Sequence, residues 1–480
     1  MLFNKRYKPI LLLQVFLMLS FSEQAFATIR LPAIFSDHMV LQQKSKVMVW
    51  GWAKPAEKVS VHNSWSTKTV SSITGIDGQW KIWITTPAAG GPYTLNFKGE
   101  NSIELKDVLL GEVWLCSGQS NMVFSLKSSN NAAQEIQKAN YPTIRYCSVS
   151  RQYGSKPFDD APGSVWEKTS PQTAGSFSAV AYYFAKKLQD TLKVPVGIIY
   201  AAWGGTPAEA WTPNELLHHD KSLSIYIDRW KKIQQDAGKD SVAYKNAMQQ
   251  WEQKSNDSSK GKVTLKKPVE PQSVYYFKRP WREPGVLFNG MINPVIPYKM
   301  KGVLWYQGES NVSYADEYEY LFSKMIESWR NKWKTTEDQT ELPFYFVQIA
   351  PFGYSDLDAA ARLREAQQSV VKNMKKAGMA VTVDVGNMKD IHYTHKKEVG
   401  DRLALIALSK DYGFKKVVYT GPKCNRVLME GSKAVVVFDQ SLKSINGNKA
   451  GGFEIGYKAP GNDSLTFVKA ETSIEGNKVV

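Results

Sequence analysis

Apolar segments that lack any alternation with polar residues recur along the chain after residue 107, and helical patterns separate them. The apolar segments are 108–115, 196–200, 303–306, 344–349 and 380–383, and the helical patterns are 177–192, 314–334, 358–376 and 396–410. Strands that are apolar on both faces are typical of a parallel sheet that helices cover on both sides. The alternation therefore predicts an α/β domain with a parallel sheet over residues 107–415.

Two flanking regions and one insertion have other patterns. Residues 28–106 alternate apolar with polar side chains at period two, which predicts a small antiparallel β-sandwich-like domain. The tryptophans in its strands are Trp50, Trp52, Trp80 and Trp83. We expect them in the core, with glycan binding as the alternative. Residues 416–480 return to a β pattern, and the charged segment 214–280 predicts inserted, solvated helices.

The first residues have the pattern of an export signal. Three basic residues precede an apolar run at 10–21, and Ala-Phe-Ala at 25–27 is typical of a signal-peptide cleavage site. We therefore expect residues 1–27 to be removed and the protein to be periplasmic or secreted. The apolar run is too short to span a bilayer comfortably, and no later run is apolar enough for a membrane helix.

Composition argues against some classes of function. The formal net charge is +16, but the basic residues form no dense run and no nucleic-acid-binding module is recognisable. The cysteines are Cys116, Cys147 and Cys424, and neither they nor the histidines have the spacing of metal ligands. A bridge between Cys116 and Cys147 is one alternative, and a small buried residue at Cys116 is the other. Neither a metal nor a cofactor is expected.

A sharp turn after the first apolar strand carries a candidate nucleophile. The segment 108–115 leads into Gly-Gln-Ser-Asn at 118–121. At the carboxyl end of a parallel strand such a turn lifts a serine hydroxyl out of the sheet into the crevice. Ser120 is therefore the candidate nucleophile. Cys116 is the alternative, and it is disfavoured because its own strand would bury it.

A nucleophilic serine needs a base, and a histidine follows the last apolar strand. Asp390 precedes His392 by two residues, so both side chains can face the same crevice. Asp390 would then accept the proton of His392 Nδ1 and leave Nε2 to take the proton of Ser120. His395, at the start of the next helical pattern, is the alternative base.

Two further strand ends carry residues that suit the binding of an oxyanion. Gly204 and Gly205 follow one strand, and a glycine lets a backbone N–H approach a substrate oxygen closely. Asn311 follows another strand and offers an amide N–H as a second donor. The polar side chains expected to support the site from behind are Gln119, Gln307 and Glu309. Of these, Glu309 is also an alternative acid.

Taken in chain order, these motifs resemble the SGNH (GDSL-like) hydrolase superfamily and, within it, the sialate O-acetylesterase family. The motifs are Gly-Gln-Ser-Asn, Trp-Gly-Gly-Thr, Gln-Gly-Glu-Ser-Asn and Asp-Ile-His, at 118–121, 203–206, 307–311 and 390–392. Further matching segments are 177–184, 209–213, 287–292, 364–367 and 399–404. The resemblance covers nearly the whole chain after residue 27. It implies a three-layer α/β/α hydrolase domain flanked by small β-sandwich-like modules.

The resemblance also implies roles for the residues of the first three motifs. Ser120 matches the nucleophile, and its own N–H would serve the oxyanion. Gly205 matches the glycine donor, with Gly204 as the alternative. Asn311 matches the asparagine donor.

The last motif matches the base and its acid, with departures in the spacing of the acid and at Tyr393, where the family often has proline. His392 matches the catalytic histidine and Asp390 its acid. The superfamily usually places the acid three residues before the histidine, where this chain has Lys389, so Asp384 is the alternative acid. The C-terminal β region of the family normally runs further than Val480, so we expect that module to be truncated.

The resemblance implies a serine esterase that removes O-acetyl groups from carbohydrate, with O-acetylated sialic acid as the expected substrate and no cofactor. An esterase of acetylated xylan or another plant glycan is the alternative with the same chemistry. A glycan-binding protein without turnover is the alternative from another class, and a metal-dependent hydrolase is more distant. No nucleic-acid partner is expected, and the oligomeric state stays open.

Overall fold

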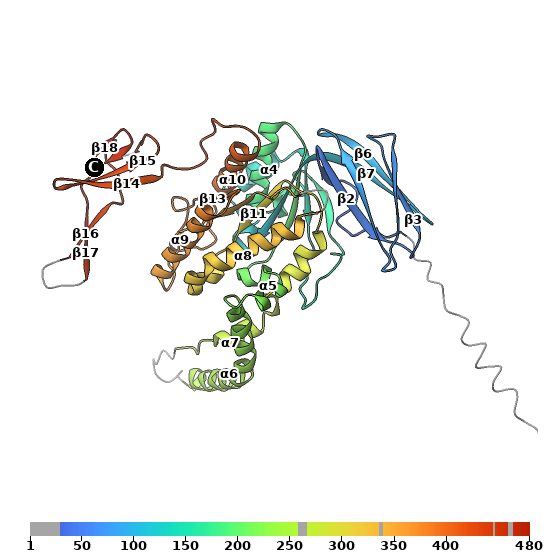
Figure 1. The fold of residues 1–480 in the computed structure, drawn as a ribbon. Helices are drawn as coiled ribbons and strands as arrows, with labels where there is room; N and C mark the ends of the chain where they lie inside the picture. Colours follow the sequence, from blue (N-terminus) through green and yellow to red (C-terminus); the bar gives the residue numbers. More distant parts are fainter. Residues whose placement is uncertain (1–28, 258–265, 336–338, 445–446, 459–463) are drawn as a thin grey trace, which may run out of the picture. The chain divides into compact units, whose positions relative to one another are not determined.

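The computed structural model describes residues 29–257, 266–335, 339–444, 447–458 and 464–480, so the expected signal segment lies outside the described residues. The chain divides into two compact units between Ala407 and Leu408. The first unit carries the candidate site residues. Figure 1 shows its two parts, a β module and a larger layered domain.

The β module is built from antiparallel strands, as the period-two pattern predicts. Its strands are β1 (Val40–Gln42), β2 (Ser45–Trp52), β3 (Lys58–Asn63), β4 (Thr69–Ile73), β5 (Gln79–Thr86), β6 (Gly90–Lys98) and the first half of β7 (Ser102–Gly118). Strand β2 pairs with β5, while β4, β3, β6 and β7 pair in that order and β1 runs parallel to β7. Trp50 and Trp80 are buried between the strands, so the core role expected for these two is confirmed.

Strand β7 belongs to both parts of the first unit. It pairs with β6 in the β module and, further along, with the central strands of the layered domain. The domain boundary expected between residues 106 and 107 therefore falls inside one continuous strand. A shared strand fixes the β module to the sheet that carries the nucleophile turn.

The layered domain contains the expected parallel sheet. Its strand order is β13–β12–β11–β7–β10–β8–β9, and all of these pairs are parallel except β8 with β9. The strands other than β7 are β8 (Tyr141–Ser148), β9 (Val165–Thr169), β10 (Val196–Ala202), β11 (Gly302–Tyr306), β12 (Phe344–Val347) and β13 (Ala377–Ala380). The apolar pattern did not predict β8 and β9. The last parallel strand was expected at 380–383, which is wrong by three residues, because Val381 and Val383 are exposed beyond the end of β13.

Helices cover both faces of this sheet, which gives the expected three layers. The covering helices are α4 (Ala179–Leu192), α8 (Ala315–Trp333), α9 (Leu357–Asn373) and α10 (Lys396–Asp411). On one face Trp114 of β7 packs against Phe184 of α4, with ring centroids 5.1 Å apart. On the other face Trp305 of β11 packs against Trp329 of α8 at 5.8 Å.

Local signals set the starts of two of these helices. Oγ of Ser178 accepts the N–H of Ala181 at the start of α4, and Oδ1 of Asp356 accepts the N–H of Ala359 at the start of α9. Both are side-chain caps that satisfy an otherwise unpaired backbone donor. At the other end of α4, Lys193 has φ 58° and the helix stops.

The charged insertion is helical, as its composition predicts. It contains α5 (Asn214–His219), α6 (Ser224–Asp257) and α7 (Gln272–Phe277). Two short helices precede the insertion in the chain, α2 (Ser120–Val123) and α3 (Ala132–Gln137). Among the described residues, no helix is long and apolar enough to cross a membrane.

The cysteines of the sheet are not bridged. Cys116 lies on β7 and Cys147 on β8, and β10 lies between these two strands. Neighbouring strands are about 4.8 Å apart, so strands two places apart exceed the span of about 7 Å that a disulfide allows between Cα atoms. Both residues are buried free thiols, and the alternative of a bridge is wrong.

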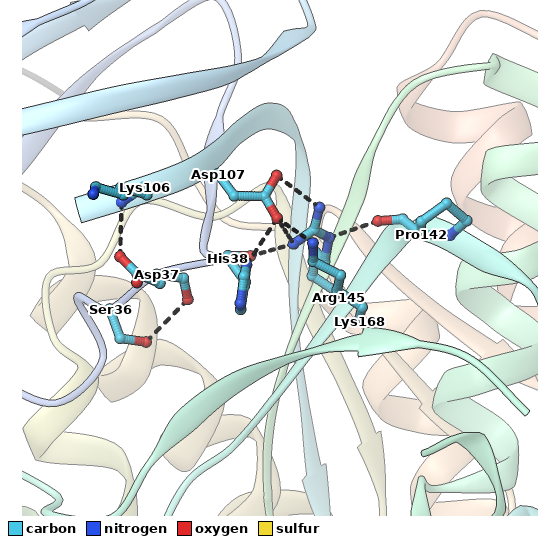
Figure 2. A network of polar contacts seen from close by, with 8 residues as sticks. All are labelled: Ser36, Asp37, His38, Lys106, Asp107, Pro142, Arg145 and Lys168. Atoms are coloured by element: carbon cyan, nitrogen blue, oxygen red, sulfur yellow. Dashed lines mark hydrogen bonds and ion pairs between the residues drawn. The ribbon is translucent and has the colours of Figure 1, made fainter. Parts of the chain in front are cut away.

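A cluster of charges joins the β module to the edge of the large sheet (Figure 2). Asp107 of β7 accepts hydrogen bonds from Arg145 of β8 at 2.9 and 3.2 Å and from His38 at 2.8 Å, and it pairs with Lys168 of β9 at 2.7 Å. Burial acts to raise the pKa of Asp107, but the bonds from Arg145, Lys168 and His38 outweigh it and hold the pKa well below its usual range. The cluster therefore favours the ionised carboxylate and the folded state.

We expect Asp107→Asn to lower the free energy of unfolding by about 3 kcal/mol at pH 7, because the guanidinium of Arg145, 4% exposed, would lose its anion. Asp107 titrates at a lower pH in the folded than in the unfolded chain. The stability that the Asp107 carboxylate contributes is therefore present above the usual aspartate pKa near 4, and it is lost as the pH falls below that value. Urea unfolding at pH 7 and pH 3 should show a large difference from wild type at pH 7 and a smaller one at pH 3.

The matched control for Asp107 is an exposed ion pair. Glu104 pairs with Lys106 at 3.2 Å with both side chains exposed, so Glu104→Gln should change the free energy of unfolding by less than about 0.5 kcal/mol. Equal losses of unfolding free energy in Asp107→Asn and Glu104→Gln would contradict a special role for the Asp107 cluster.

The second unit has its own small sheets. Strands β14 (Cys424–Glu430), β15 (Lys433–Phe438), β18 (Ile474–Glu475) and β19 (Lys478–Val479) form one sheet, and β16 (Glu454–Lys458) pairs with β17 (Leu465–Lys469). These strands lie where the sequence returns to a β pattern.

Candidate active site

A glycine makes the turn before Ser120 possible. Gly118 ends β7 with φ 133°, and a Cβ atom there would lie 2.1 Å from the carbonyl O of Tyr306 on β11. The N–H of Gln119 donates to that same carbonyl at 2.9 Å. The chain then begins α2 at Ser120, so the end of β7 lifts the hydroxyl away from the sheet, as the sequence predicts.

The structure brings Ser120 and His392 into contact. Oγ of Ser120 lies 2.8 Å from Nε2 of His392, although the two residues are 272 positions apart in the chain. A cavity of about 450 Å³ opens beside the pair. Its lining residues are Ser120, Val123, Phe124, Ser125, Lys127, Ser128, Ser176 and His392. A substrate in this cavity could reach the hydroxyl and the imidazole together.

The two acids considered for His392 lie in different surroundings. Oδ1 of Asp390 accepts the backbone N–H of His392 at 2.8 Å, which fixes the loop that carries the ring. The hydrogen bond expected from His392 Nδ1 to Asp390 stays a prediction. Asp384 forms two hydrogen bonds with Arg402, at 2.7 and 2.5 Å, and these bonds lower the pKa of Asp384.

The alternative base lies elsewhere. His395 contacts Asn130 and Glu398 and lines a separate cavity, so the structure places His392 next to Ser120 and does not place His395 there.

Of the two glycines after β10, Gly204 lies next to Ser120. Gly205 has φ 71°, in the left-handed region that favours glycine, and an ideal Cβ on Gly204 would lie 3.4 Å from Cβ of Ser120. Within the described part of the chain, the N–H groups of Ser120 and Gly205 have no protein acceptor. Both N–H groups are therefore unpaired, and their expected role in binding an oxyanion stays a prediction.

Hydrogen bonds hold the side chain of Asn311. Its Oδ1 accepts from the N–H of Ala208 at 2.9 Å and from Nε2 of Gln307 at 2.6 Å. Its Nδ2 donates to Oε2 of Glu209 at 2.8 Å and carries a second N–H. Burial raises the pKa of Glu209, while the bond from Asn311 opposes this shift. The amide orientation of Asn311 is therefore fixed, and its role as an oxyanion donor stays a prediction.

The remaining predicted residues lie behind the site. Oε1 of Gln119 accepts the N–H of Ser310 at 3.2 Å, so it links the nucleophile turn to the loop after β11. Oε1 of Gln307 accepts from the hydroxyl of Tyr318 at 2.9 Å. Glu309 binds Asn121 and does not contact Ser120 or His392. Within the described residues, no group of three or more His, Cys, Asp or Glu side chains is placed to hold a metal ion.

The family follows from a comparison over most of the chain. The model of the carbohydrate esterase family described as sialic acid-specific acetylesterase matches residues 110–264 and 276–409, which is more than half of the chain. The chain belongs to this family. It is therefore a carboxylic ester hydrolase, and the matched residues include Ser120 and His392.

Relatives of the same family match nearly the whole chain. The sialate O-acetylesterase of Mus musculus is 29% identical over 88% of this chain and 81% of its own length. That of Homo sapiens is 29% identical over 85% of this chain and 76% of its own length. The crystal structure of a carbohydrate acetylesterase from Xanthomonas citri is 32% identical, with a TM-score of 0.75 over 94% of this chain and 90% of that one.

Sequence reasoning missed some residues that this family member uses to build the site. Asn121 is part of the Gly-Gln-Ser-Asn motif, but no role was predicted for it. Lys396 begins α10 and is fully buried, four residues after His392. A lysine in the first turn of a helix gives no signal of burial. Only the position of Asn121 inside a motif could have pointed to it.

Proposed function

We propose that this protein is a sialate O-acetylesterase that uses Ser120 as its nucleophile. The observation that carries the proposal is the 2.8 Å contact between Oγ of Ser120 and Nε2 of His392, beside an open cavity. Membership of an acetylesterase family and two sialate O-acetylesterase relatives support the substrate. A glycan-binding protein without turnover would have no need of the paired hydroxyl and imidazole.

The first half of the reaction forms an acetyl-enzyme. Oγ of Ser120 attacks the acetyl carbonyl while Nε2 of His392 takes the hydroxyl proton. The N–H groups of Ser120 and Gly205, with the free N–H of Asn311, bind the negative oxygen of the tetrahedral intermediate. The intermediate collapses, the bond from carbon to the sugar oxygen breaks, and His392 returns the proton to that oxygen.

The second half releases acetate. Water attacks the acetyl carbonyl of the acetyl-enzyme, and Nε2 of His392 takes a proton from this water. The bond between carbon and Oγ of Ser120 then breaks, and the serine oxygen recovers the proton. Every proton taken by the imidazole is returned, so the enzyme ends in its starting state without a cofactor.

The cavity beside Ser120 suits an anionic sugar. Three serines of its lining, Ser125, Ser128 and Ser176, offer hydroxyl groups to a sugar. Lys127 adds a cation, and within the described residues it forms no ion pair. Sialic acid carries a carboxylate, whereas the sugars of xylan backbones are neutral. We therefore propose that Lys127 binds the substrate carboxylate.

Lys127→Met is expected to raise the KM for O-acetylated sialic acid about tenfold, the equivalent of one charge-assisted hydrogen bond. The kcat for this substrate and the hydrolysis of a neutral acetyl ester should change little, because the variant keeps the reacting groups. The measurement is acetate release over a range of substrate concentrations.

The matched control is Lys138→Met, because Lys138 is another exposed lysine and lines a different cavity. It should leave the KM unchanged. If acetylated xylan were the preferred substrate and Lys127→Met had no effect on KM, the plant-glycan alternative would replace the proposal while Ser120 kept its role.

A further inference from the structure

The side chain of Asn121 ties the nucleophile turn to the loop of the reacting histidine. Asn121 directly follows Ser120, and Ile391 directly precedes His392. Nδ2 of Asn121 donates to the carbonyl O of Ile391 at 3.1 Å. The Asn121 side chain is 1% exposed, so bulk water does not compete for this bond. The bond therefore couples the positions of the two residues whose side chains meet.

A buried lysine fixes the orientation of the Asn121 amide. Nζ of Lys396 donates to Oδ1 of Asn121 at 2.5 Å, and a lysine ammonium offers only donors. The carbonyl of Ile391 can only accept, so the NH₂ group of the amide faces Ile391 and its oxygen faces Lys396.

The surroundings of Lys396 act on its charge in opposite directions. Three rings lie around its Nζ, which favours a cation there: Tyr393 at 3.8 Å, Phe124 at 4.9 Å and Tyr306 at 5.5 Å. Burial lowers the pKa of Lys396 to about 7, against the opposing charges of Glu309 and Asp390.

The second hydrogen of the Asn121 amide is bonded to a carboxyl group. Nδ2 of Asn121 also donates to Oε1 of Glu309 at 2.5 Å. Within the described residues, Oε2 of Glu309 is buried without a hydrogen-bond partner. Burial raises the pKa of Glu309, while its bond from Asn121 and the charge of Lys396 act in the opposite direction. Each hydrogen of the Asn121 amide thus has one acceptor, and its oxygen has a fixed donor.

We propose that Asn121, held between Lys396 and Glu309, is a positioning residue that fixes the His392 loop against the nucleophile turn. The proposal rests on the serine chemistry proposed above, but it does not depend on which sugar carries the acetyl group. A displacement of a reacting group by about 1 Å can cost about 100-fold in rate. Loss of Asn121 should therefore lower kcat, whereas the KM of a small ester should stay nearly constant.

The test is Asn121→Ala, assayed with p-nitrophenyl acetate. The expected result is a fall in kcat of about 100-fold, from the displacement argument above, with a change in KM of less than about twofold. Active sites are counted from the end point of covalent labelling of Ser120 with a fluorophosphonate, carried to completion, and kcat is expressed per labelled site. A residue with a merely structural role would lower the number of folded sites and leave kcat per site unchanged.

A second variant keeps the size of the side chain. Asn121→Asp still offers an oxygen to Lys396 but loses both amide donors, to Ile391 O and to Oε1 of Glu309, and places a second carboxyl group beside Glu309. We expect its kcat to fall about as much as that of Asn121→Ala, because the His392 loop would be displaced in both variants. Wild-type kcat per site in Asn121→Asp would overturn the proposal, because the coupling bond would then be dispensable.

The matched control is another buried asparagine. Asn289 is 3% exposed, and its Nδ2 donates to the carbonyl O of Gly154 at 3.0 Å, away from the His392 loop. Asn289→Ala should lower the thermal midpoint of unfolding and keep kcat per site. Equal falls of kcat per site in Asn289→Ala and Asn121→Ala would also overturn the proposal. Full activity of Ser120→Ala is a different result, which would overturn the serine mechanism itself.

Discussion

Ser120→Ala is expected to lower the kcat of acetyl-ester hydrolysis by about 10⁵-fold, the scale of losses seen when a serine nucleophile is removed. The variant keeps the backbone N–H groups of the oxyanion site and the imidazole of His392, but it has no oxygen that can form the acetyl-enzyme. The change is small and the residue lies at the surface of a cavity, so the thermal midpoint of unfolding should stay within a few degrees of wild type. The measurement is acetate release together with a thermal unfolding curve.

The control for Ser120→Ala is the other nucleophile that the sequence offers. Cys116 lies four residues earlier, fully buried on β7, and burial raises the pKa of its thiol well above the usual range. A thiol that stays protonated is a poor nucleophile. Cys116→Ala should therefore keep kcat while losing some stability to the cavity it creates. Activity that survives in Ser120→Ala and vanishes in Cys116→Ala would reverse the assignment.

The sequence predicted the parallel sheet well because its strands are apolar on both faces. Strand β10, for example, is buried along its whole length, so no polar residue interrupts the signal. The prediction failed at both edges of the sheet and at β8, the strand next to one edge, and the two edge strands show a physical reason. Strand β9 has exposed residues at Val165, Glu167 and Lys168, so it lacks the continuous apolar run of a central strand. Strand β13 is only four residues long, and the exposed valines that follow it extended the apparent pattern.

The site was predictable where chemistry depends on residue type and unpredictable where it depends on packing. Ser120 and His392 were found because a serine after a strand and a histidine after the last strand suit acyl transfer. Lys396 was not found, because a lysine on a helix is usually solvated and only the tertiary structure buries it. The export expected from residues 1–27 stays a prediction, since that segment lies outside the described residues.

His392→Ala is expected to lower kcat by about 10⁴-fold or more, because no other base in the described part of the chain stands within hydrogen-bond distance of Oγ of Ser120. Within the described residues, His392 is the side chain that contacts this hydroxyl. The same variant should also slow the labelling of Ser120 by a fluorophosphonate, since the attack on phosphorus needs the same proton transfer. Loss of ester hydrolysis with unchanged labelling would contradict the role of His392 as the base for the nucleophile.

The same assays can distinguish Asp390 from Asp384 as the acid that pairs with His392. Asp390→Ala removes both the bond to the backbone N–H of His392 and the partner proposed for Nδ1, so we expect kcat to fall about 100-fold, less than for His392→Ala. Asp384→Ala breaks an ion pair with Arg402 and should cost stability while kcat per labelled site is kept. A larger fall of kcat per labelled site in Asp384→Ala than in Asp390→Ala would identify Asp384 as the acid that pairs with His392. It would also require Asp384 to leave Arg402 when substrate binds, because in this structure its two oxygens are already bound to the guanidinium.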